Sequence, residues 1–325
     1  TEEELITYKL IYPRIIHSEL MTYRMMSVNS ASSRAIPVDK LISVIEETPF
    51  YPIAYQKKHS GMQGSNYFTS EEDVKICDSL WEESMQESIR VAKKMLESGI
   101  SKQIINRTLE SYQYHCCLMT GTRESFEHLF NQRCPIYDIK GVETKYKSRK
   151  EAINNHDWLK EYDDLWWLQH NKGQAEIHFM DLAEKMYDAL NESEPVIMKE
   201  DEWHIPFSDR PEFTPEMSLK DKIILSCAIT ARTSYTVISD NETLTLEKAK
   251  SIYTKCVEQG HFSVVSHCAK CMTDKEYRIW IKGEIEREDY IVAIPQETQG
   301  YCKNICGFIP LRQYVEDGVE LSKFK

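Results

Sequence analysis

A regular spacing of apolar residues between positions 70 and 98 restricts the fold more than any other feature of the sequence. The apolar side chains recur every three or four positions, as they do along one face of an α-helix. They are Val74, Cys77, Trp81, Met85, Ile89, Ala92 and Leu96. Ser70 and Asp73 resemble the start of a capping box, and Gly99 can end the helix in a left-handed conformation. The sequence therefore predicts one long amphipathic helix that needs a core to pack against.

Shorter elements are predicted around this helix. Residues 5–12 are rich in Ile, Leu and Tyr and predict a strand, whereas residues 27–33 are small and polar and predict a loop. Further helices are predicted over residues 102–120, 123–132, 176–190 and 246–259, and short strands and turns over residues 286–325. The predicted fold class is α+β, with a sheet that carries the polar loop and long helices packed on one face.

Composition divides the chain into three parts. Residues 135–172 are charged, show weak periodicity and contain Trp158, Trp166 and Trp167. We interpret them as an insertion, and their aromatic content argues against plain disorder. A first half, residues 1–134, precedes the insertion, and a second half, residues 173–325, follows it. Residues 191–220 hold several prolines and many acids, which is typical of a connector.

The formal net charge of the 325 residues is −12. Such a chain repels polyanions on average, which argues against broad nucleic-acid binding, although a few arginines can still form a pocket for one phosphate. The sequence contains no apolar run of the ~18 residues that a membrane-spanning helix needs. Residues 1–4 are acidic and lack the basic start of a signal peptide. We therefore expect a cytoplasmic protein with no membrane contact.

The ten cysteines are expected to be free thiols, because a long chain without a secretory signal seldom forms disulfides. Cys116 and Cys117 lie in a mixed apolar stretch, and we interpret them as small buried residues. The spacing of four other thiols admits a tetrahedral zinc site, made by Cys268, Cys271, Cys302 and Cys306. Two unrelated pairs of core thiols are the favoured interpretation, so no metal is predicted.

Residues 23–34 combine a basic residue, a run of small hydroxyl residues and a second basic residue. Arg24 and Arg34 flank Ser27, Ser30, Ser32 and Ser33. Hydroxyl groups, exposed backbone N–H groups and guanidinium groups together form a good cradle for a phosphate, because arginine can bind two oxygens at once. A solvated turn is the alternative interpretation.

The order of these residues resembles the signature of flavin-dependent thymidylate synthases, in which an arginine is followed by seven residues and a serine. Arg24, Ser32 and Arg34 occupy these positions. Several further segments resemble the long, bacteriophage-type branch of that family; they are residues 13–22, 35–38, 61–63, 102–107, 126–134, 174–177 and 202–207. Residues 226–235 and 260–267 resemble a block that lies at the N-terminus of most family members. The resemblance therefore implies a circular permutation.

The family converts deoxyuridine monophosphate (dUMP) to thymidine monophosphate. Its members take the carbon from methylenetetrahydrofolate and use flavin adenine dinucleotide (FAD) reduced by NADPH, so the resemblance implies these partners and a homotetramer with shared sites. In such a reaction, arginines and backbone N–H groups would stabilise charge on the uracil oxygens, and the flavin would carry the hydride.

The resemblance also implies roles for individual residues. Substrate-binding residues would be Glu19, Ser32, Arg34, Arg107 and Arg133, with the phosphate at Ser32 and Arg34. Arg24 and Arg133 would be catalytic. Flavin-binding residues would be Tyr23, Arg24, His128, Ser234 and His267. The chain has Tyr23, His128 and Ser266 where the family has His, Asn and Glu.

Because these differences fall on the flavin side, two alternatives stay open. One is a pyrimidine-nucleotide enzyme with changed chemistry, such as hydroxymethylation; the other is a non-catalytic nucleotide-binding or structural derivative. The basic run at residues 145–150 is interpreted as a solvated face, with a subunit or folate contact as the alternative.

Overall fold

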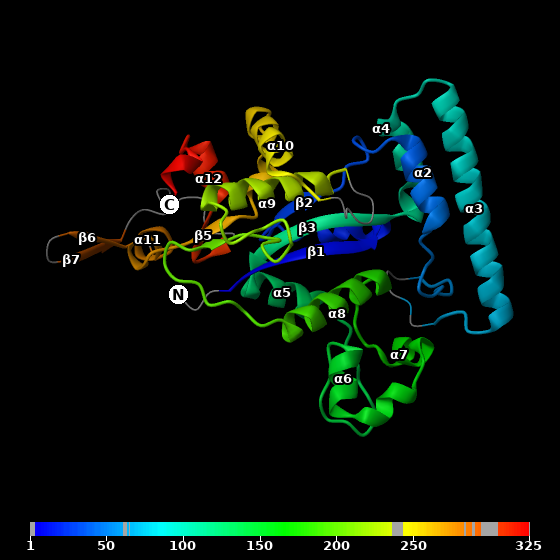
Figure 1. Cartoon of the computed structure of the whole chain (residues 1–325). Coiled ribbons are helices and arrows are strands. Elements are labelled where there is room, and N and C mark those ends of the chain that lie inside the picture. Colours follow the sequence, from blue (N-terminus) through cyan, green and yellow to red (C-terminus); the bar gives the residue numbers. More distant parts are fainter. Residues whose placement is uncertain are drawn as a thin grey trace.

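A computed structural model describes residues 4–60, 64, 66–235, 243–282, 284–287, 290–293 and 305–324. At its centre is an antiparallel sheet in the order β1 (Leu5–Pro13), β3 (Tyr114–Thr122) and β2 (Ser27–Ser30) (Figure 1). Leu5 pairs with Thr122 at one end of the sheet, and Ser30 pairs with Cys117 near the other. The predicted strand over residues 5–12 is confirmed, and so is the burial of Cys116 and Cys117 in β3.

The prediction of one helix over residues 102–120 was wrong. A short helix, α4 (Lys102–Ile105), leads into a 3-10 helix, η2 (Asn106–Tyr112), and the chain then becomes the central strand β3. Every residue of β3 after Tyr114 is buried, because helices cover both faces of the sheet. A strand buried on both faces has no alternating pattern, so its sequence cannot be distinguished from that of a buried helix by periodicity.

One face of the sheet packs on α5 (Arg123–Arg133) and α8 (Ile177–Glu192), which confirms the helices predicted over residues 123–132 and 176–190. Their shared core includes Leu10, Tyr12, Phe126 and Phe179. Two short elements, η1 (Arg14–Ile16) and α1 (His17–Leu20), continue from β1 on this side.

The other face packs on α9 (Leu219–Thr233), which is joined by α10 (Leu246–Glu258) and the 3-10 helix η4 (Phe262–Val265) (Figure 1). The helix predicted over residues 246–259 is confirmed, but the prediction that helices cover one face was wrong. The sequence pattern did not reveal α9, because residues 223–231 are all buried and the helix has no polar face.

The long helix predicted over residues 70–98 is confirmed as α3 (Glu71–Glu97), with the Ser70 side chain accepting a hydrogen bond from the backbone N–H of Asp73. It packs with α2 (Val38–Glu47) and η2 beyond one end of the central sheet (Figure 1). Their core contains Leu41, Ile45, Met85, Ile89 and Leu109.

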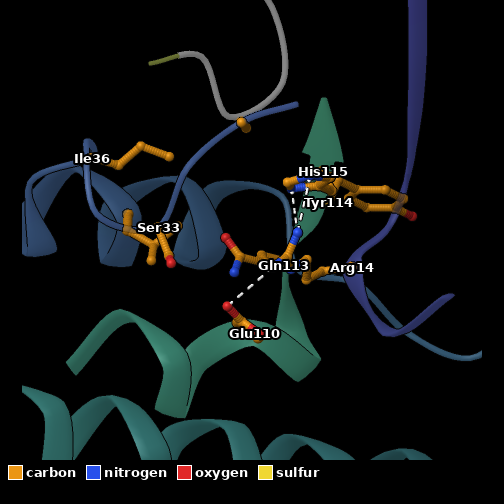
Figure 2. A pocket seen from close by; sticks show the side chains of 9 residues that line it. Arg14, Ser33, Ile36, Glu110, Gln113, Tyr114 and His115 are labelled. Carbon is orange, nitrogen blue, oxygen red and sulfur yellow. Dashed lines mark hydrogen bonds and ion pairs between the residues drawn. The ribbon is translucent and has the colours of Figure 1, made fainter. Parts of the chain in front are cut away.

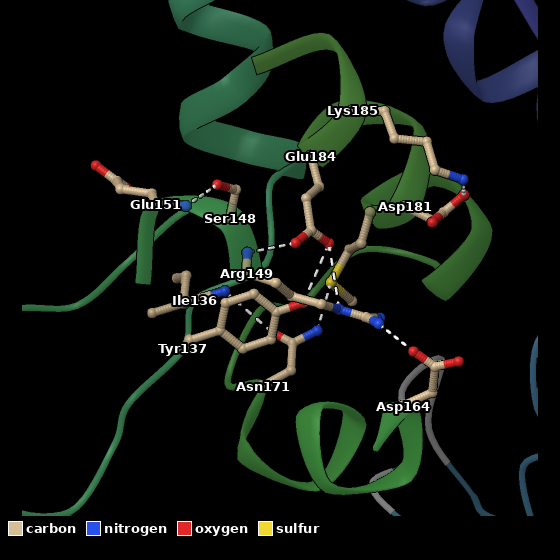
Figure 3. Close-up of polar contacts among 11 residues, drawn as sticks. Ile136, Tyr137, Ser148, Arg149, Glu151, Asp164, Asn171, Asp181, Glu184 and Lys185 are labelled. Atoms are coloured by element: carbon tan, nitrogen blue, oxygen red, sulfur yellow. Dashed lines mark hydrogen bonds and ion pairs between the residues drawn. The ribbon is translucent and has the colours of Figure 1, made fainter. Parts of the chain in front are cut away.

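Residues 135–172 fold as a compact unit with α6 (Arg149–Asn155), η3 (Asp157–Glu161) and α7 (Asp164–His170) around Tyr137, Leu159 and Trp167. Glu184 of α8 anchors this unit, because its carboxylate accepts hydrogen bonds from the backbone N–H of Arg149 and from the Tyr137 hydroxyl, at 2.5 and 3.1 Å (Figure 3). In the basic run, the side chains of Lys145, Arg149 and Lys150 form ion pairs with acids of this unit and of α8.

A second sheet, in the order β4 (Trp203–His204), β5 (Ala269–Cys271) and β8 (Phe308–Pro310), lies beside the first. The strands β6 (Glu284–Arg287) and β7 (Tyr290–Ala293) form a hairpin. The remaining elements of this half are α11 (Asp274–Trp280), α12 (Leu311–Glu316) and η7 (Leu321–Lys323). Among the described residues, none of the helices has the length and apolar character needed to cross a membrane.

Candidate functional site

The polar loop after β2 is held by hydrogen bonds from three separate parts of the chain. Its backbone donates from Ala31 N–H to the Cys116 carbonyl at 2.8 Å and from Ser32 N–H to the Ser234 carbonyl at 3.0 Å. The buried Asn106 side chain donates to the carbonyls of Ser33 and Ile36, at 2.7 and 2.9 Å. Residues 31–36, which we call the serine loop, are therefore fixed in place although they form no regular element.

The loop predicted over residues 27–33 is shorter in the structure, because its first four residues form β2. Asn29 explains the difference. Its amide donates to the Thr230 carbonyl at 2.8 Å and to the Thr233 hydroxyl at 2.6 Å, and its carbonyl accepts from the Ser263 hydroxyl at 2.9 Å. A buried amide that has partners on α9 and η4 holds this polar segment in the sheet.

A small pocket lies between the serine loop and the start of β3 (Figure 2). Ser33 and Ile36 lie on one side, and Arg14 and His115 lie on the other. The space inside is about 10 Å³, room for about one water molecule. The Arg14 guanidinium donates to His115 Nε2 at 3.0 Å and to Glu110 Oε1 at 3.3 Å. This pocket therefore places a largely buried guanidinium beside the serine loop.

Both histidines near Arg14 are neutral. Burial, helped by the Arg14 charge, lowers the pKa of His17 to about 4, and burial together with Arg14 and His17 lowers the pKa of His115 to about 2. The two rings lie 4.3 Å apart, and His17 Nδ1 contacts the Tyr12 hydroxyl at 2.7 Å. Arg14 Nη1 lies 3.0 Å from His115 Nε2 and 3.4 Å from His115 Nδ1, so the guanidinium faces the edge of the ring that carries both nitrogens.

A second cluster joins four residues that the resemblance had singled out. The Tyr23 hydroxyl donates to Gln132 Oε1 and accepts from Arg133 Nε, both at 2.9 Å. Arg133 Nη1 also contacts Glu19 Oε2 at 3.5 Å, and the Gln132 amide contacts His128 Nε2 at 2.9 Å. We call these residues the Tyr23 cluster. Gln132 belongs to the resembling segment at residues 126–134, but the resemblance implies no role for it.

Aromatic rings surround the guanidinium of the Tyr23 cluster. The Arg133 guanidinium carbon lies 5.0 Å from the centre of the Phe179 ring and 5.8 Å from that of Tyr23. The Tyr23 ring meets Phe179 and His128 edge to face, at centroid distances of 6.1 and 6.5 Å. Tyr23 is buried, whereas His128 is exposed. The cluster therefore fixes one guanidinium at the edge of the aromatic core.

Three arginines that the sequence predicted as site residues are exposed. They are Arg24, Arg34 and Arg107. Across the part of the chain that the structure describes, their guanidinium groups make neither hydrogen bonds nor ion pairs. Arg34 belongs to the serine loop, and Arg107 directly follows Asn106, which holds that loop. Arg34 and Arg107 therefore belong to segments that are joined by hydrogen bonds, and both are available to an anion.

The two predicted flavin contacts from the second half have different surroundings. Ser234 is half-buried, and its carbonyl accepts the hydrogen bond from Ser32, so Ser234 lies beside the serine loop. His267 has no exposed surface, and its Nδ1 contacts the Thr120 hydroxyl at 2.8 Å. Burial lowers the pKa of His267 to about 3. Contact between His267 and a flavin would require the surrounding segments to move.

The cysteines considered for zinc do not converge. The Cys268 thiol lies 4.0 Å from that of Cys227 in the core around α9, whereas Cys271 belongs to a separate core with Ile305 and Phe308. Within the described ranges, His, Cys, Asp and Glu form no group of three or more that could hold a metal ion. Cys302, like the resembling segment at residues 61–63, lies outside the described residues.

Comparison with protein-family models gives no match, and comparison with curated protein sequences gives none. The structure is similar to crystal structures of the UMP/dUMP methylase PolB from Streptomyces cacaoi. The form bound with 5-Br dUMP is 13% identical with a TM-score of 0.37, and the match covers 57% of this chain and 65% of that chain. The form bound with 5-Br UMP is 15% identical with a TM-score of 0.39, and the match covers 57% and 68%.

The match with the 5-Br dUMP form covers less than two thirds of the PolB chain. TM-scores of 0.37 and 0.39 do not establish a common fold.

Proposed function

We propose that this chain binds a pyrimidine nucleoside monophosphate with its phosphate at the serine loop, and that it methylates the base. The observation that carries the proposal is the juxtaposition of the anchored serine loop with Arg14, Arg34 and the Arg107 segment. Residues 1–134 supply all of these groups. The proposed reaction is the reductive methylation of dUMP with methylenetetrahydrofolate, FAD and NADPH, as the sequence resemblance implies.

The phosphate assignment follows from hydrogen-bonding capacity. The backbone of the serine loop is fixed by Cys116, Ser234 and Asn106, so the hydroxyls of Ser32 and Ser33 need little ordering when an anion binds. Exposed arginines beside such hydroxyls provide bidentate, charge-assisted hydrogen bonds. In a chain with a net charge of −12, this local excess of cations favours one small anion over a polyanion.

The Tyr23 cluster is suited to the base. A guanidinium carries five N–H donors, and the contacts of Arg133 to Tyr23 and Glu19 occupy two of them within the described residues. The remaining donors can stabilise negative charge that develops on a ring oxygen when a uracil carbon acts as nucleophile. Because Tyr23 and Glu19 fix the guanidinium before substrate binds, it needs little reorganisation during the reaction.

The residues on the flavin side fit a cofactor in part. Arg24 and His128 are exposed and Ser234 is half-buried, so these three side chains can contact a bound FAD, whereas His267 is enclosed. When bound, FAD would supply the hydride that the proposed methylation consumes. The contribution of this chain would be to bind the cofactor and to orient the nucleotide toward it.

A homotetramer is part of the proposal. Helix α3 exposes large apolar side chains, Ile76 and Leu80 among them, at 53% and 60%. Apolar side chains on the outer face of a long helix are consistent with a second copy packing there. The circular permutation likewise stays a prediction that rests on the order of the resembling segments.

The proposal is tested by calorimetric titration of the full chain with dUMP. Wild type is compared with Arg34→Ala and Arg107→Ala, and with Arg90→Ala as the matched control, because Arg90 is an exposed arginine of α3 paired with Glu87. We expect Arg34→Ala and Arg107→Ala to bind dUMP about ten- to hundred-fold more weakly, because each loses charge-assisted hydrogen bonds, and we expect Arg90→Ala to bind dUMP as wild type does.

The absence of dUMP binding by wild type would overturn the proposal. If dUMP binds, the mass of the product formed with methylenetetrahydrofolate, FAD and NADPH separates methylation from hydroxymethylation. Binding without turnover would identify a nucleotide-binding derivative.

A further inference from the structure

Four polar side chains form a continuous line of contacts that joins the two sheets. His204 Nε2 contacts the Thr7 hydroxyl, Thr7 contacts the Thr120 hydroxyl, and Thr120 contacts His267 Nδ1, each at 2.8 Å. Thr120 and His267 have no exposed surface, and Thr7 and His204 are partly buried. Water therefore has little access to the two inner contacts, and the protons in this line must be shared among its members.

Strand pairing positions all four groups. Thr7 of β1 and Thr120 of β3 are direct cross-strand partners, so their hydroxyls meet on one face of the central sheet. His204 of β4 pairs with Ala269 of β5, and His267 lies two residues before Ala269 in the chain. The pairing of β4 with β5 therefore brings both imidazoles to the same pair of threonines.

The protons available for these contacts can be counted. Burial lowers the pKa of His204 to about 4 and that of His267 to about 3, so near neutral pH each imidazole carries one N–H. Three contacts need three donated protons, but two hydroxyls supply only two. The third proton must come from one of the two imidazoles, and this requirement allows two arrangements.

In the first arrangement, His267 Nδ1–H donates to Thr120, Thr120 donates to Thr7, and Thr7 donates to His204 Nε2, so His204 carries its proton on Nδ1. In the second, His204 Nε2–H donates to Thr7, Thr7 donates to Thr120, and Thr120 donates to His267 Nδ1, so His267 carries its proton on Nε2. With one ring as Nδ1–H and the other as Nε2–H, either one contact lacks a proton or one hydroxyl proton is left over, and the described residues give the Thr7 and Thr120 hydroxyls no further acceptor. A buried contact or hydroxyl left unsatisfied in this way is disfavoured by about five-fold or more.

We infer that Thr7 and Thr120 couple the tautomers of His204 and His267, so that both rings are Nδ1–H or both are Nε2–H. The coupling has a consequence at the inner end of the line. His267 Nε2 is a buried side-chain atom without a hydrogen-bond partner among the described residues. Through Thr7 and Thr120, the tautomer of His204 therefore determines whether His267 Nε2 carries a proton or a lone pair. If the surrounding segments move so that His267 contacts the proposed FAD, this tautomer would set the polarity of that contact; this last clause alone rests on the proposed function.

The inference is tested by nitrogen–proton correlation spectra of the full chain, labelled with ¹⁵N at histidine, near neutral pH and without added ligand. His204→Gln assigns one ring and His267→Gln the other. We expect both rings to show the same tautomer. Opposite tautomers, or an imidazolium at either position, would overturn the inference. Because no nucleotide is present, this outcome is independent of whether the chain binds dUMP.

Variants of Thr7 test whether agreement of the tautomers results from coupling. Thr7→Ser keeps the hydroxyl and is expected to keep the wild-type spectrum. Thr7→Val removes the hydroxyl at nearly constant volume and should shift the tautomer ratio of at least one ring by about five-fold or more. Thr230→Val is the matched control, because the buried Thr230 hydroxyl bonds only to the Ser226 carbonyl of its own helix within the described residues. Unchanged ratios in a folded Thr7→Val variant would refute the coupling.

Discussion

Tyr23→Phe removes one hydroxyl from the Tyr23 cluster and leaves the buried ring in place. The hydroxyl donates to Gln132 and accepts from Arg133, both at 2.9 Å. A neutral hydrogen bond contributes about 1 kcal/mol and one to a charged group about 1.5–3 kcal/mol. The Arg133 side chain is 26% exposed, so water can replace part of the second contribution. We therefore expect the free energy of unfolding to fall by about 2 kcal/mol.

The same substitution should weaken nucleotide binding. Without the Tyr23 hydroxyl, the one hydrogen bond that Arg133 still makes to a described residue is the 3.5 Å contact with Glu19. Its guanidinium is then no longer fixed before the substrate binds. We expect dUMP affinity to fall by about ten-fold, the effect of roughly one lost charged hydrogen bond. Urea denaturation measures the stability, and calorimetric titration with dUMP measures the affinity.

Tyr55→Phe is the control for this experiment, because the Tyr55 hydroxyl bonds to Asp78 of α3 at 2.8 Å. It should lower stability without changing dUMP affinity. If Tyr23→Phe binds dUMP as tightly as wild type, or if its stability is unchanged, the Tyr23 hydroxyl is not what holds Arg133.

Three further predictions follow from other contacts. Glu110→Gln removes the carboxylate that pairs with Arg14 at 3.3 Å and so frees the guanidinium for another anion. Calorimetry should therefore show inorganic phosphate binding about five-fold more tightly to this variant than to wild type. Weaker phosphate binding would exclude Arg14 from the phosphate site. Asn29→Ala removes three buried hydrogen bonds to α9 and η4 and should lower the free energy of unfolding by about 3 kcal/mol in urea, whereas a loss below about 1 kcal/mol would contradict the anchoring role. The free energy of unfolding should also fall as the pH is lowered. Below the ordinary histidine pKa of 6.5, the unfolded chain binds protons that the folded chain does not bind. Each such histidine lowers the free energy of unfolding by about 1.4 kcal/mol per pH unit, until the pH reaches its pKa in the folded chain. The groups concerned are His17, His115, His204 and His267. Urea denaturation between pH 7 and about 4 measures this slope, and a flat profile would contradict the burial of neutral imidazoles.

Periodicity predicted the helices that have one polar face and failed for elements that are buried on all sides. The helix α3 was predicted nearly to its ends, because its apolar stripe faces a core and its N-terminus is capped by Ser70. The strand β3 and the helix α9 lack a solvent-facing stripe, so their sequences carry no period that separates strand from helix.

The site was predicted residue by residue but not as a set of contacts. The resemblance singled out Tyr23 and Arg133 separately, and only the packing of α5 against the start of the chain shows that their side chains touch. Arg14 received no role, although it follows Pro13 at the end of a predicted strand. Its place beside the serine loop depends on the pairing of β1 with β3, which a single sequence does not specify.

Titration of the purified full chain with FAD, with and without dUMP, tests the proposed methylation, and the visible absorption spectrum is recorded during the titration. We expect FAD to bind, its bands at about 370 and 450 nm to shift, and dUMP to increase the affinity for FAD, because the nucleotide and the cofactor would lie together. A chain that does not bind FAD, and whose affinity for it does not increase with dUMP, would contradict the proposed methylation.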